Sequence, residues 1–181
     1  QLADFGSGSA TIRFDVSTVS RSARDWIDVW VQAWDTQEQL AVDLSTPTSQ
    51  GNPRNAVHIE MGGGCCGFRS DGAFHVEVYD GGRNQVAEIP STGATWNAVL
   101  QPSAQARSTV EIVLSRSHIK VWMPQTGLVW VDQSIPTLNF SQGVVPLGHH
   151  SYSASEGGDL LTKDSVGRAN SWHWDNVSIS P

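Results

Sequence analysis

Two short runs of the sequence alternate His and Glu with apolar residues, a pattern that can place acid–base groups side by side. The runs are Val57–Met61 and Phe74–Tyr79. Successive side chains of a strand point to opposite faces, so the apolar residues of each run would share one face and the polar residues the other. If the two runs pair as a hairpin, one polar face carries His58, Glu60, His75 and Glu77.

Four interpretations of this quartet stay open from the sequence. It can be a solvated strand face with local His–Glu hydrogen bonds, or a set of hydrogen-bonding subsites for sugar hydroxyls. It can be a catalytic pair, because two carboxyl groups about 5–5.5 Å apart serve a retaining glycosidase as acid and nucleophile; Glu60 and Glu77 would fill those roles. It can also be a His/Glu site for zinc or another divalent ion.

The run from Trp26 to Trp34 predicts a strand with one core face and one binding face. Ile27, Val29, Val31 and Ala33 form the apolar side. The other side interleaves indole rings with hydrogen-bonding groups: Trp26, Asp28, Trp30, Gln32 and Trp34. Indoles can stack on pyranose rings while Asp and Gln bind hydroxyls, so this face predicts a sugar cleft. The competing interpretation is that these rings pack beneath loops crossing the sheet.

Other candidate residues lie outside these runs. The strand His118–Met123 presents Trp122, a further candidate for ligand binding, and the ligand set predicted with it includes His58 and His75. His149 and Tyr152 are candidates for the catalytic pair of a lyase. Cys65 and Cys66 are adjacent, so they can form a vicinal disulfide, remain as two thiols, or bind a soft metal.

The elements that would position these residues are short strands, because no stretch keeps a helical period. Prolines fall between or at the ends of the runs, as expected where ladder hydrogen bonds are absent. The predicted strands are Ala10–Val16, Asp25–Asp35, Ala56–Met61, Ala73–Asp80, Val86–Ile89, Thr109–Ser115, His118–Met123, Leu128–Asp132 and Ser171–Ser180. Within them we expect Trp130 to face outward and Asp175 to be buried. Many short strands without helices predict a sandwich or a barrel.

Composition narrows the partners. The chain has 181 residues, which fits one domain over 1–181, and a net charge of −7 with Lys120 and Lys163 as its two lysines. Nucleic acids and anionic membranes both need a basic face, so neither is an expected partner. No apolar run is long enough for a membrane span. No leader precedes Gln1, which would fit a secreted chain whose signal peptide has been removed. Eight tryptophans exceed what a core needs, which favours rings that face a ligand.

The chain resembles the concanavalin A-like lectin/glucanase superfamily, in particular its secreted, laminin-G-like bacterial members. The similarity lies in Ile12–Val16, Val110–Met123, Gly127–Val131 and the closing strand Trp174–Ile179 with its Asp-Asn-aliphatic pattern. The resemblance implies an antiparallel two-sheet jelly-roll sandwich that binds sugar on a concave sheet, and often one structural Ca²⁺, for which Asp175 is the candidate ligand. The Glu-x-Asp-x-x-Glu motif of laminarinase-like glucanases is absent, as are the Arg-x-Glu-x-Arg and Gln-Ile-His motifs of alginate lyases.

Three functions are therefore compatible with the sequence. The first is a carbohydrate-binding or lectin-like domain that binds a polysaccharide on a tryptophan-lined face. The second is a polysaccharide-cleaving enzyme, a hydrolase or a lyase, that uses the His/Glu face. The third is an adhesive or structural extracellular domain, whose aromatic patches would be covered by partner chains.

Overall fold

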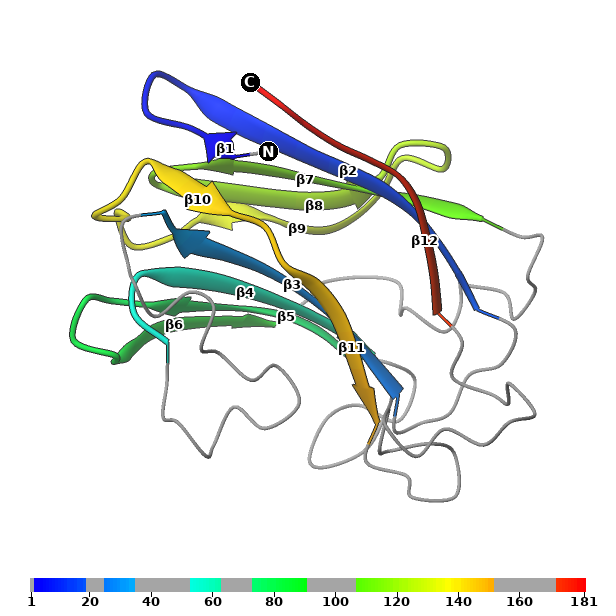
Figure 1. Ribbon diagram of the computed structural model, residues 1–181, viewed down its shortest axis with the longest axis horizontal. Helices are drawn as coiled ribbons and strands as arrows, with labels where there is room; N and C mark the ends of the chain where they lie inside the picture. The colour runs from blue at the N-terminus through cyan, green and yellow to red at the C-terminus, as the bar shows by residue number, and fades with distance from the viewer. Residues whose placement is uncertain (1, 19–24, 35–52, 63–72, 91–106, 152–171) are drawn as a thin grey trace.

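Two antiparallel sheets stacked face to face make up the computed structural model, which describes residues 2–18, 25–34, 53–62, 73–90, 107–151 and 172–181 (Figure 1). One sheet has seven strands and the other has five. Within the described ranges no helix is long and apolar enough to cross a membrane. The predicted all-β, two-sheet sandwich is confirmed.

The seven-stranded sheet has the order β1-β10-β3-β4-β5-β6, and β11 also pairs with β3. Its strands are β1 (Ala3–Asp4), β3 (Asp25–Ala33), β4 (Ala56–Gly62), β5 (Ala73–Tyr79), β6 (Gln85–Pro90), β10 (Gln142–Val144) and β11 (Leu147–Ser151). The five-stranded sheet has the order β12-β2-β7-β8-β9. Its strands are β2 (Ser9–Thr18), β7 (Ser108–Ser115), β8 (His118–Met123), β9 (Leu128–Ser134) and β12 (Trp172–Ser180).

The core lies between the sheets and is built from alternate residues of each strand. On β3 the predicted apolar side is fully buried, and its members belong to one cluster with the inward residues of the five-stranded sheet. The facing residues come mainly from β2, β7 and β8: Ile12, Phe14, Val16, Val110, Ile112, Leu114, Ile119 and Val121. A strand buried on one face is held in register by that face, because a slip of one residue would turn its apolar side chains outward. The buried face of β3 therefore also determines which of its side chains lie on the outer face.

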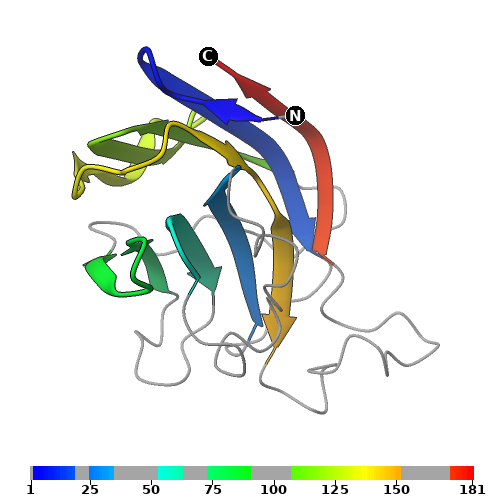
Figure 2. The same ribbon diagram turned by 60° about the vertical axis from the view of Figure 1, so that its left-hand side comes forward.

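The second edge of β3 is covered by β10 and β11, two short strands that the sequence did not predict. β10 pairs with Gln32 and Ala33, and β11 pairs with the first half of β3. Between them Pro146 contributes its carbonyl oxygen to the Trp30 amide, with N and O 3.0 Å apart. A side chain on Gly143 would clash, because a Cβ there would lie 2.8 Å from the Gln32 carbonyl oxygen. β3 is therefore an interior strand of a curved sheet (Figure 2).

Two predicted side-chain directions are wrong, and irregular pairing explains both. The register shifts between Val121 and Trp122 where β8 meets β9, and Trp130 turns into the core with no exposed surface. On β12 the register shifts between Asp175 and Ser178, and Asn176 has a positive φ of 50°. Asp175 is exposed as a result. A bulge inserts one residue, so alternation counted along the sequence fails beyond it.

Candidate functional site

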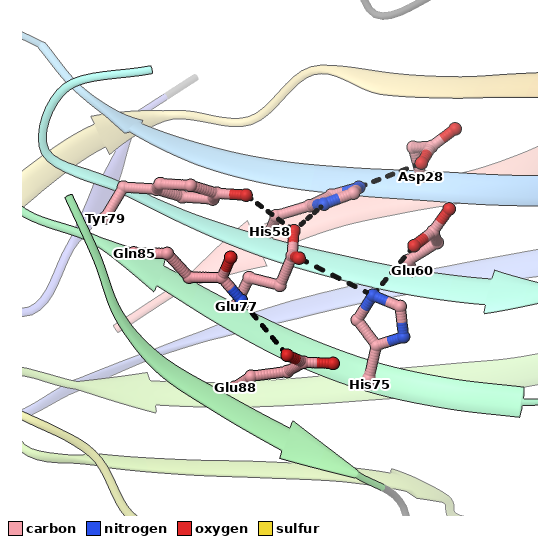
Figure 3. Close-up of polar contacts among 8 residues, drawn as sticks. All are labelled: Asp28, His58, Glu60, His75, Glu77, Tyr79, Gln85 and Glu88. Carbon is pink, nitrogen blue, oxygen red and sulfur yellow. Dashed lines mark hydrogen bonds and ion pairs between the residues drawn. The ribbon is translucent and has the colours of Figure 1, made fainter. Parts of the chain in front are cut away.

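The outer face of β3, β4 and β5 brings the predicted polar residues together in two adjoining rows. β4 and β5 pair as predicted, so His58 lies opposite Glu77 and Glu60 lies opposite His75. β3 extends each row by one residue, with Trp30 opposite His58 and Asp28 opposite Glu60. Tyr79, two residues beyond Glu77 on β5, faces the same way (Figure 3).

His58 lies between two carboxylates and links β3 to β5. Its Nε2 is 2.9 Å from Asp28 Oδ1, and its Nδ1 is 2.9 Å from Glu77 Oε2. A carboxylate only accepts hydrogen bonds, so both ring nitrogens must donate, which only an imidazolium can do. The Tyr79 hydroxyl donates a further bond of 2.8 Å to the same Glu77 oxygen. The result is a chain of polar contacts from Asp28 to Tyr79.

The charge states follow from these contacts. Burial opposes a charge on His58, but hydrogen bonds to Asp28 and Glu77 outweigh it and raise the pKa of His58 to about 10. Burial also opposes the charge of Glu77, yet the His58 hydrogen bond keeps the pKa of Glu77 below its ordinary value. Burial, together with the Glu77 charge, raises the pKa of the Tyr79 hydroxyl. At neutral pH this series of contacts therefore contains a protonated His58, an ionised Glu77 and a neutral Tyr79 phenol.

A second His–Glu contact lies beside the first. His75 Nε2 is 2.8 Å from Glu60 Oε2 and 3.9 Å from Glu77 Oε1. These two carboxylate oxygens therefore lie at most about 7 Å apart, so Glu60 and Glu77 are neighbours on this face.

The cluster is layered, with the imidazole rings and Asp28 beneath and two glutamates above them. His58, His75 and Asp28 are buried, whereas Glu60 and Glu77 are partly accessible. On β6 the exposed Glu88 lies directly opposite Glu77, and its Oε2 is 3.4 Å from Gln85 Nε2. A ligand that approaches this face thus meets acceptor oxygens before it meets the imidazole rings. Tyr79, Gln85 and Glu88 were outside the predicted site, although the same alternation along Val86–Ile89 would have indicated Glu88.

Trp30 is buried and not exposed as a platform. Its side chain is 2 % exposed, and its ring stacks on the His58 ring with centroids 3.8 Å apart and planes 8° from parallel. Gln32, two residues further along β3 on the same face, is equally buried. Neither the Trp30 Nε1 nor the Gln32 amide has a hydrogen-bond partner among the residues that the structure describes. Buried polar groups normally find partners, so these groups mark a position where water or a ligand would bind.

Trp34 is an accessible indole at the end of this strand. It follows β3 directly, is 58 % exposed, and lines a hollow of about 250 Å³ with Asn139, Phe140, Ser141 and Gln142. An apolar ring beside amide and hydroxyl groups is the composition of a small sugar subsite.

The remaining predicted residues do not join the cluster or cannot be placed in it. Trp122 lies on the outer face of the five-stranded sheet, on the opposite side of the sandwich. His149 occupies the register position opposite Ile27, while His150 lies opposite Trp26. The side chains of Trp26 and His149 lie outside the described part of the structure, as do Tyr152, Cys65 and Cys66 entirely.

Asp175, the calcium ligand that the resemblance implies, already has protein partners among the described residues. Asp175 forms an ion pair with Arg107 and accepts the Asn176 amide hydrogen, while Asp15 accepts hydrogen bonds from Thr109 and Asn176. Ca²⁺ needs six to eight oxygen ligands, and no group of three or more His, Cys, Asp or Glu among the described residues is arranged to hold a metal. At the other cluster, a protonated His58 has no lone pair to offer to zinc.

Comparisons with known proteins identify the fold and no family. No family model matches the chain, and no curated protein matches it. Among solved structures, a carbohydrate-binding module of the type CBM66 from Bacillus subtilis aligns over all of this chain and 78 % of its own, with a TM-score of 0.50 and 8 % identity. An alginate lyase of polysaccharide lyase family 7 aligns over 99 % of this chain and 62 % of its own, with a TM-score of 0.40 and 15 % identity. The alginate lyase from Corynebacterium sp. aligns over 82 % of this chain and 62 % of its own, with a TM-score of 0.34 and 10 % identity.

The class that the fold defines is thus the jelly-roll sandwich, shared with a carbohydrate-binding module. At these identities the likeness extends to the fold alone, so a function must be argued from the side chains of this chain.

Proposed function

We propose that the chain is an extracellular carbohydrate-binding domain of the concanavalin A-like superfamily. Its site would be the outer face of β3 to β6. The observation that carries the proposal is the layered cluster, in which buried His58 and His75 hold the partly accessible Glu77 and Glu60 in fixed positions. Sugars present rows of hydroxyl donors, and carboxylates that are held in place accept them without a large entropic cost.

Trp34 supplies the stacking surface in this proposal. Its exposed ring and the neighbouring amides form a hollow beyond the end of β3, whereas Trp30 is covered on one face by His58. A polysaccharide that stacks on Trp34 and runs along the face would reach the carboxylates. Of the indoles predicted to stack, Trp34 is exposed and Trp30 is buried.

The experiment is a screen of the chain against a panel of neutral, anionic and amino polysaccharides by affinity gel electrophoresis. We expect retardation by at least one polysaccharide, and loss of about 1–3 kcal/mol of binding free energy in Trp34→Ala. Trp122→Ala, on the opposite sheet, is the matched control and should migrate like the wild type. Unretarded migration in every gel would refute the proposal.

A second candidate is a polysaccharide-cleaving enzyme, favoured by one observation. Glu60 and Glu77 both contact His75 Nε2, and Glu77 stays ionised, as a nucleophile or base must. Glu60 would then have to deliver the proton to the leaving group. Release of reducing ends from the same panel, lost in Glu77→Gln and Glu60→Gln, would establish this activity. Binding without release of product would exclude it for the polysaccharides tested.

A further inference from the structure

Glu77 and Glu88 form a like-charged pair directly opposite each other on β5 and β6. Directly opposed side chains on antiparallel strands have Cβ atoms about 4.5–5.5 Å apart, and like charges there destabilise the sheet. Glu77 does not relieve the repulsion by taking up a proton, because its pKa is lowered. Glu88 makes no ion pair with any residue that the structure describes. The two strands therefore hold a repulsion that an added cation would remove. Figure 3 draws both side chains.

The charge that a ligand meets at this pair is negative. Glu77 Oε2 accepts the bonds from His58 and Tyr79, whereas Glu77 Oε1 lies 3.9 Å from His75 Nε2, beyond hydrogen-bond distance. Glu88 is exposed and shares one oxygen with the Gln85 amide. No lysine or arginine stands on the strand positions of β3 to β6. The site thus offers open acceptor oxygens without an accessible cation on these strands.

A second feature points to a ligand on the same face. Trp30 and His58 continue the row of Glu77 and Glu88 across the sheet, since each is paired with the next. At the far end of this row the buried Trp30 indole N–H has no partner among the described residues, and neither has the Gln32 amide beside it. The face therefore lacks hydrogen-bond partners at one end and positive charge at the other.

We propose that the ligand is a polysaccharide of amino sugars, whose ammonium group binds between Glu77 and Glu88. This rests on the proposed carbohydrate-binding function and names its substrate class. An ammonium group supplies three donors and a positive charge, which is what two ionised carboxylates accept. Neutral sugars would form only the hydroxyl contacts. A uronate polymer would add carboxylates to a face that already carries several.

The experiment compares two oligosaccharides that differ only at nitrogen. A glucosamine hexamer and an N-acetylglucosamine hexamer are titrated into the full chain by calorimetry, at a pH where the free amines are protonated. At about 20 mM salt we expect the glucosamine hexamer to bind about tenfold more tightly, and the ratio to shrink at about 0.5 M salt because the contacts are electrostatic. A uronate hexamer should not bind.

Two variants test whether the preference for the glucosamine hexamer depends on the Glu77–Glu88 pair. Glu88→Gln should bring the affinities of the two hexamers to within about twofold, whereas Asp132→Asn, an exposed carboxylate on the other sheet, should keep the preference. The glucosamine hexamer should also raise the midpoint of thermal unfolding of the wild type more than that of Glu88→Gln.

Two results would overturn the inference while leaving the proposed function intact: equal or tighter binding of the acetylated hexamer, and preferential binding of the uronate hexamer. An unchanged preference in Glu88→Gln would show that the ammonium binds elsewhere. Failure of every sugar to bind, neutral ones included, would remove the proposed function together with the inference.

Discussion

The outer faces of the two sheets carry similar residue types in different arrangements. On the five-stranded sheet the polar side chains pair with one another: His118 is 3.1 Å from Asp132, and Arg13 is 3.7 Å from Glu111. Trp122 donates its N–H to Glu111, and the Lys120 ammonium lies 4.4 Å from the ring centroid. Every one of these groups has a partner within the face.

On the outer face of the seven-stranded sheet the polar groups are not all paired with one another in this way. Its imidazole rings are buried, and Glu77 and Glu88, which are more accessible, oppose each other. Two buried polar groups, the Trp30 indole N–H and the Gln32 amide, lack partners among the described residues. Unmatched charge and unmatched hydrogen-bonding groups are retained where another molecule completes them. We therefore base the proposed binding face on its unpaired groups and not on its residue types alone.

The largest expected effect comes from removing the buried cation. In His58→Ala the Asp28 and Glu77 carboxylates lose the imidazolium between them, so we expect a loss of about 3–5 kcal/mol in the free energy of unfolding. The counterpart on the other face, His118→Ala, removes an exposed pair and should cost less than about 1 kcal/mol. Urea unfolding measures both. Equal costs would mean that the two faces do not differ as described.

The pH dependence of stability gives the next largest effect. The pKa of His58 is raised to about 10 in the folded chain, above its ordinary value of 6.5, so the folded state holds a proton that the unfolded state releases. The stabilisation is therefore complete below about pH 6.5 and is lost as the pH rises toward 10. The free energy of unfolding should fall between pH 7 and 10 in the wild type, and fall less in His58→Gln. Parallel profiles for the two proteins would contradict the imidazolium.

The smallest expected effect has the opposite sign. Glu88→Gln removes the repulsion with Glu77 and should raise the free energy of unfolding by about 0.2–1 kcal/mol. The matched change on the other face, Glu111→Gln, breaks an attractive contact with Arg13 and should lower it slightly. A destabilised Glu88→Gln would show that the cross-strand pair is not repulsive in the free protein.

Alternation with a period of two predicted the parts of the site that lie in regular strands. It assigned the buried side of β3, paired β4 with β5, and put two His and two Glu on one face, as the structure has them. It could not distinguish an outward side chain that is exposed from one that is buried, and so Trp30 was predicted as a stacking platform. Alternation indicates on which face of the sheet a side chain lies, but it does not indicate whether other residues cover that side chain.

The remaining errors come from interactions that leave no periodic signal. Trp130 turns inward because of an irregularity in the pairing of β8 with β9, and the bulge near Asn176 exposes Asp175. Each depends on how a neighbouring strand aligns. β10 has three residues and β11 has five, which is too short for a pattern to stand out. The protonation of His58 likewise follows from two carboxylates that the fold brings together from β3 and β5.

The most direct test of the central claim is calorimetric titration of the best-retained polysaccharide into the wild type, Glu77→Gln and Glu111→Gln. We expect at least tenfold weaker binding for Glu77→Gln, because a charged acceptor held by His58 and Tyr79 on the seven-stranded sheet is lost. Glu111→Gln, on the outer face of the five-stranded sheet, should leave binding unchanged. Circular dichroism should show all three proteins folded. Full affinity in Glu77→Gln, or loss of affinity in Glu111→Gln, would contradict the assignment of the binding face.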